Sequence, residues 1–169
     1  MNKIILIVAC FGMLNLQGQN PEISEQDREF AEKAMSNSLM KLKLAELATN
    51  KGFSKPVKDL ATQILNDHKK ADDVLREIAT NKSIPIQNKL DDDQQKRYNT
   101  LADKVGEDFD RAYTDWVVDA HKDAISHYET ETKKGENTEL RAFATNALPS
   151  LVKHKNMAEQ TCKKIRKKS

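Results

Sequence analysis

The chain has 169 residues, of which 32% are charged and only 5% aromatic, with five glycines and four prolines. A chain of this length is a typical size for one domain with its own core, and this composition favours long helices over a β-sandwich or a disordered chain. The formal net charge of +2 gives no strongly basic face, so nothing in the composition argues for a nucleic-acid partner.

The first 18 residues have the pattern of a secretory signal peptide. A short positive segment with Lys3 precedes an uncharged apolar run from Ile4 to Leu16, and polar residues follow. About 13 apolar residues are too few to span a bilayer, which needs about 20. We therefore expect cleavage near Gly18, export to the periplasm or outer membrane, no transmembrane segment after processing, and a single mature domain over residues 19–169.

A second processing route stays open, because the stretch from Ile7 to Cys10 resembles a lipoprotein box in which Cys10 is lipidated after cleavage. If Cys10 instead leaves with the leader, Cys162 is the only cysteine and no internal disulfide can form. We expect Cys162 to be a small buried residue on the last helix.

Four long helices and one short helix are predicted in the mature chain from apolar periodicity and from cap and stop residues. Gly52, Gly106 and Gly135 are expected to end helices, Pro85 keeps residues 83–90 extended, and Pro149 should bend the last helix. The predicted helices cover residues 24–51, 54–82, 91–104, 107–134 and 138–164. Short loops within two helix pairs and a longer crossover between them predict an all-α, ferritin-like four-helix bundle with one short extra helix.

One titratable residue interrupts the apolar stripe of the second predicted helix. The stripe repeats at steps of three and four residues, which is typical of a helix packed against other helices, and His68 completes it. Its apolar members are Val57, Ala61, Ile64, Ala71, Leu75 and Ile78.

Two later helices repeat this arrangement, with His121 and His154 near their midpoints. The midpoints of all helices in a bundle lie at one level, so we expect the rings of His68, His121 and His154 to converge. Bundles build metal sites from side chains on facing helices, and imidazole binds zinc, copper and iron. The pattern predicts a single transition metal such as zinc, whose affinity should fall below about pH 6.5 as imidazoles become protonated.

Di-iron chemistry is excluded by the residues around these histidines. A di-iron bundle needs Glu three residues before His on two helices, but Leu65 and Leu151 stand there, and the first helix offers Lys41. Asp67 and Asp119 lie beside the stripes and not on them. No catalytic residue is predicted, and an enzyme is not the favoured interpretation.

The alternative is that the three histidines are core residues whose hydrogen bonds fix helix register. His127 is expected at the surface, and Tyr113 and Trp116 are expected in the core. Asp91 to Asp93 should cap the short helix, and the basic C-terminal residues from Lys163 onward should form a solvated helix end.

The chain resembles domain-of-unknown-function family 4142 over about residues 25–162. The resemblance implies a ferritin-like bundle in exported bacterial proteins that are often described as outer-membrane proteins, without an established activity. It rests on Leu47-Ala48, Val57 to Ala61, Asn66-Asp67-His68, Phe109-Asp110, Tyr113, Val117, His121, Phe143-Ala144, Leu148-Pro149 and His154. Two function classes therefore stay open: a periplasmic metal-binding protein, and a structural or stress-related envelope protein with a hydrogen-bonded histidine core.

Overall fold

The computed structural model describes residues 23–167, and these residues form five α-helices and no strand. The predicted all-α helical bundle is confirmed, and each predicted helix is found within a few residues of its expected bounds. The predicted leader and Cys10 lie outside the described residues. The helices are α1 (Glu25–Lys51), α2 (Lys55–Asn81), α3 (Asp92–Ala102), α4 (Gly106–Lys134) and α5 (Thr138–Arg166).

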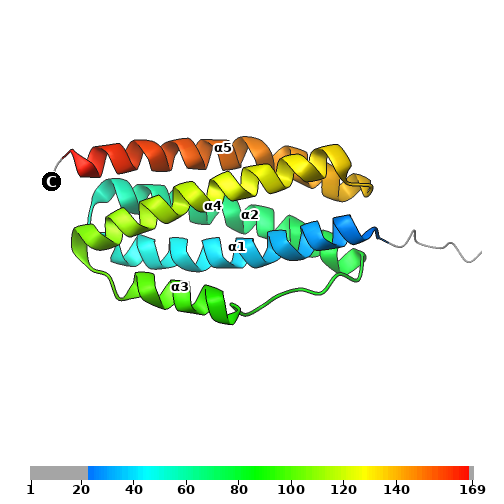
Figure 1. Ribbon diagram of the computed structural model, residues 1–169, viewed down its shortest axis with the longest axis horizontal. Coiled ribbons are helices and arrows are strands. Elements are labelled where there is room, and N and C mark those ends of the chain that lie inside the picture. The colour runs from blue at the N-terminus through cyan, green and yellow to red at the C-terminus, as the bar shows by residue number, and fades with distance from the viewer. Residues whose placement is uncertain (1–22, 168–169) are drawn as a thin grey trace, which may run out of the picture.

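Four long helices form the bundle, and their order explains the crossover. α1 packs on α2 and α4 packs on α5, while contacts of α2 with α5 and of α1 with α4 close the ring. α1 and α5 run in one direction and α2 and α4 in the other (Figure 1). Because α2 and α4 are parallel, the chain between them must return along the bundle. It does so through an extended segment and α3, which packs against α1 and α4.

Side-chain caps begin two of the helices where the sequence predicts them. The hydroxyl of Ser24 accepts a hydrogen bond from the backbone N–H of Asp27 at 3.2 Å. Asp91 and Gln94 form a capping box at the start of α3, in which each side chain bonds the other residue's backbone N–H. Such caps satisfy N–H groups that have no partner inside the helix, so they fix where the helix begins.

Gly106 begins α4, and the prediction that it ends the preceding helix is wrong. α3 stops at Ala102, and Gly106 follows as the first residue of α4 with a φ of +57°. Only glycine adopts this left-handed conformation without strain. The glycine therefore marks the sharp turn into α4. α5 continues through Pro149 as one helix, and the predicted bend stays a prediction.

The buried carboxylate of Asp27 joins two distant parts of the chain. It is 1% exposed and accepts hydrogen bonds from the backbone N–H groups of Glu136 at 3.1 Å and Asn137 at 3.0 Å. These two residues form the turn between α4 and α5. Asp27 thus fastens the start of α1 to the other helix pair, a role that its place in the Ser24 cap does not reveal.

The apolar core consists of two clusters along the bundle. One cluster includes Leu44, Leu60 and Tyr113, and the other includes Phe30 and Leu75. The burial predicted for Tyr113, Trp116 and Cys162 is confirmed: Tyr113 is fully buried, Trp116 packs partly buried against the first cluster, and Cys162 is buried. Within residues 23–167 no helix has an apolar stretch long enough to cross a bilayer.

Candidate metal centre

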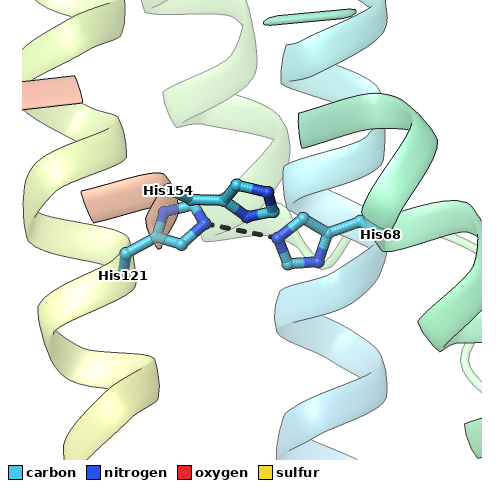
Figure 2. Close-up of side chains that lie close together, drawn as sticks. All are labelled: His68, His121 and His154. Atoms are coloured by element: carbon cyan, nitrogen blue, oxygen red, sulfur yellow. Dashed lines mark hydrogen bonds between the residues drawn. The ribbon is translucent and has the colours of Figure 1, made fainter. Parts of the chain in front are cut away.

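The structure brings the three predicted histidines together from three helices. His68 on α2, His121 on α4 and His154 on α5 are 8%, 0% and 1% exposed. Their ring centroids are 5.4, 5.3 and 5.4 Å apart, and Figure 2 shows the rings pointing towards one another. The three histidines therefore form one buried layer, which we call the histidine layer.

Hydrogen bonding fixes the orientation of His121. Its Nδ1 lies 2.8 Å from the carbonyl oxygen of Val117, and a carbonyl can only accept, so Nδ1 carries the proton. In the neutral ring Nε2 then has a free lone pair. Nε2 of His68 lies 3.3 Å from this atom and donates to it when no metal is present.

His154 is held by a carboxylate from the neighbouring helix. Its Nε2 lies 2.9 Å from Oδ2 of Asp67, so Nε2 is the donor and Nδ1 has the lone pair. Nδ1 is buried and has no hydrogen-bond partner among the described residues. A carboxylate behind a histidine is the usual support of a metal ligand, because it orients the ring and makes the other nitrogen more basic.

The spacing of the ring nitrogens fits a small ion. One nitrogen from each of the three histidines lies within 4.8 Å of the others. Zinc bonds of about 2.0–2.1 Å place neighbouring nitrogens of a tetrahedral site about 3.3 Å apart. The 3.3 Å between Nε2 of His68 and Nε2 of His121 is close to that separation and is also the length of their hydrogen bond. The three nitrogens together lie within 4.8 Å, so any pair near that limit has to move closer around a bound ion. Three nitrogen ligands would leave a fourth position for a further ligand.

Burial keeps the histidine layer neutral. It lowers the pKa of His68 well below 6.5 and that of His121 to about 3. Burial also lowers the pKa of His154, although the Asp67 carboxylate opposes this effect. Neutral imidazole is the form that binds a metal. Protons therefore compete with a metal at a lower pH than the value of about 6.5 expected from the sequence.

Lys41 occupies the side of the bundle that α1 provides. It is 5% exposed, and its Nζ lies 3.5 Å from the carbonyl oxygen of Asn37. Burial lowers its pKa to about 8, against the attraction of Asp123. Its charge lowers the pKa of His68 and His121 further. Lys41 thus stands on the helix where a di-iron bundle would need a carboxylate, and the candidate ligand group found within residues 23–167 consists of the three histidines.

Two other predicted residues stand apart from the layer. His127 was expected at the surface, but it is half-buried and its ring centroid lies 5.0 Å from that of Phe30 on α1. α1 covers this position, and the apolar stripe of α4 alone does not predict which neighbouring helix will do so. Asp119 is exposed and lines a separate cavity of about 740 Å³ beside Lys41.

Sequence patterns missed the role of Asp67. We placed it beside the stripe, where it does lie, and assigned it no partner. It accepts hydrogen bonds from Gln63 at 2.8 Å and from His154. Its position next to His68 was the available signal, because a residue beside the core stripe faces the adjoining helix.

We expect acid to destabilise the metal-free protein through these histidines. Their pKa is lower in the fold than in the unfolded chain, so below about pH 6.5 the unfolded chain takes up protons that the folded chain does not. For His121, with a pKa of about 3, the free energy of unfolding should fall on the order of 2 kcal/mol between about pH 6.5 and 5. Denaturant melts of wild type and His121→Gln check this. An equal pH dependence in both proteins would contradict it.

The family of the chain follows from a match that covers most of its length. The model of a family described as "Domain of unknown function (DUF4142)" matches residues 13–161. The chain belongs to this family. Among curated proteins no relative matches the chain.

A solved structure has the same fold as this DUF4142 protein. It is described as "Crystal structure of DUF305 fragment from Deinococcus radiodurans" and is 12% identical. The similarity covers 85% of this chain and 99% of that one, with a TM-score of 0.75. At this identity the likeness shows the fold alone. The function of this DUF4142 protein must therefore be argued from its own residues.

Proposed function

We propose that this DUF4142 protein binds one transition metal ion, zinc foremost, through His68, His121 and His154. The observation that carries the proposal is a buried layer of three neutral imidazoles with one nitrogen of each within 4.8 Å. Imidazole nitrogen suits zinc, copper, nickel and iron, and zinc accepts three such ligands with an open fourth position. The ferritin-like class named above is the scaffold we propose for this site.

The existing hydrogen bonds of the carboxylate beside the layer, Asp67, favour metal binding over catalysis. Asp67 already accepts bonds from Gln63 and His154, and the ammonium of Lys153 lies 3.7 Å from it. A carboxylate held in this way orients a ligand and is poorly placed to move protons. We therefore propose that the protein binds the metal ion and does not use it for catalysis. Its place in the envelope depends on the export proposed below.

The alternative function is a structural envelope protein whose histidines only stabilise the core. It is favoured by the contacts of His121, which bonds both Val117 and His68 without a metal. The buried Nδ1 of His154, which has no partner in residues 23–167, argues against it. A buried polar atom is normally satisfied, and a metal would satisfy this one.

Zinc binding to protein purified without an affinity tag tests the proposal. We expect one zinc per chain in a calorimetric titration of metal-free protein, because the layer can hold a single ion. His127→Ala is the matched control, since His127 is another histidine of α4 but is half-buried and lies outside the layer. No binding by wild type, or loss of binding in His127→Ala, would contradict the assignment.

We further propose that the protein is exported with loss of residues 1–18. The positive start, the uncharged apolar run and the polar residues that follow support this. Intact-mass measurement of the natively expressed protein should give the chain from residue 19 onward. A mass that retains the leader would refute export by cleavage, and a lipid adduct on Cys10 would establish the lipoprotein route instead.

A further inference from the structure

A cavity of about 360 Å³ lies between α2 and α5 and reaches the histidine layer. His68, His154 and Asp67 are part of its lining. Cavities that bind drug-sized ligands start at about 300 Å³, so this one fits a small molecule. A ligand in this cavity would lie next to two members of the histidine layer.

The rest of the cavity is mostly apolar, and the space in it exists because two small residues line it. Ala71 on α2 and Ala147 on α5 leave space that larger side chains would fill. The rings of Tyr128 and Phe143 also line it, tilted with centroids 5.9 Å apart. Val74 in the lining is 49% exposed. An apolar cavity with an aromatic pair suits a flat apolar body, since rings stack edge-on or offset on one another.

Three exposed polar groups of the lining can donate hydrogen bonds. Lys70, Asn146 and Ser150 are exposed residues of the lining and supply an ammonium, an amide and a hydroxyl. The carboxylate of Asp67 is already bonded to His154 and Gln63. The charge of Asp67 is paired with the ammonium of Lys153 at 3.7 Å, whereas Lys70 has no ion pair within residues 23–167. A ligand's polar end therefore meets hydrogen-bond donors and the unpaired positive charge of Lys70, which favours an anion.

We propose that this cavity binds a small aromatic carboxylate, with its ring against the tilted pair of Tyr128 and Phe143 and its carboxylate towards Lys70. This binding site goes beyond the metal proposal and does not depend on it, because none of the contacts invoked involves a metal. The metal-free protein is therefore the material for the test.

Benzoate is the probe, and benzyl alcohol is its uncharged counterpart. We expect benzoate to bind metal-free wild type, and benzyl alcohol to bind about tenfold more weakly because charge-assisted hydrogen bonds are lost. Ala147→Leu, which fills the cavity, should weaken benzoate binding by about tenfold or more. Ala142→Leu is the matched control on the exposed face of α5 and should keep the wild-type affinity. Binding is measured by ligand-observed NMR titration.

Each outcome bears on the cavity alone. No benzoate binding by folded wild type overturns the proposal, whatever zinc does. Unchanged affinity in Ala147→Leu overturns the location, and equal affinity for the two probes overturns the preference for an anion. If Ala147→Leu does not fold, as judged by its helical circular dichroism, Ala71→Leu fills the same cavity from α2 and gives the same comparison.

Discussion

Zinc is expected to raise the melting temperature of the wild-type protein and to leave that of His121→Ala unchanged. Free zinc at about 100 times its dissociation constant stabilises a fold by about 2.7 kcal/mol. For a chain of this size this corresponds to a shift of about 5–10 °C. His121 is fully buried and its Nε2 lies 3.3 Å from that of His68, so removing it leaves two nitrogens that hold the ion weakly. Thermal melts with and without zinc measure both shifts.

The other results of this experiment distinguish the two functions. A shift in both proteins would mean that zinc binds at the surface and not at the layer. No shift in either would support the hydrogen-bonded core, in which His121→Ala still lowers stability by about 1–3 kcal/mol because buried partners lose a bond. His127→Ala should keep the full zinc shift.

Leu75→Ala is expected to lower the free energy of unfolding by about 2–5 kcal/mol, the usual cost of emptying a buried leucine site. Leu75 lies two turns after His68 on α2, is 1% exposed and belongs to the core cluster with Phe30. Its neighbour Val74 is 49% exposed and provides the control, since Val74→Ala should cost less than about 0.5 kcal/mol. Denaturant melts compare the two, and similar small losses would show that the stripe does not bury Leu75.

The sequence was sufficient to predict the helices and the histidine layer because both depend on local patterns. A stripe at steps of three and four residues places His68 and Leu75 on the same buried face, whichever helices cover it. Caps such as Ser24 and Asp91 mark helix starts through bonds that reach only three residues along the chain. The four long helices have similar lengths of 27 and 29 residues, which puts their midpoints at one level.

The features that the sequence did not predict depend on how one helix packs against another. The hydrogen bond from His154 to Asp67 joins residues 87 apart, and the packing of His127 on Phe30 depends on α1 covering α4. Lys41 was noticed as an unsuitable metal ligand, but its burial was not predicted, since lysine is rarely buried. No periodic pattern within one helix identifies the polar residue that a neighbouring helix will cover.

The hydrogen bonds of Asp27 have a consequence for the order in which parts of this protein fold. Its backbone partners lie 109 and 110 residues further along the chain. A chain that appears with its N-terminus first, as during synthesis, presents this carboxylate long before the groups that satisfy it. Until then the hydroxyl of Ser24 is its nearby donor, and burying the carboxylate with that one bond would be costly. We therefore expect the start of α1 to be fixed in place only when the turn between α4 and α5 has formed. The first helix to appear is thus among the last to be secured.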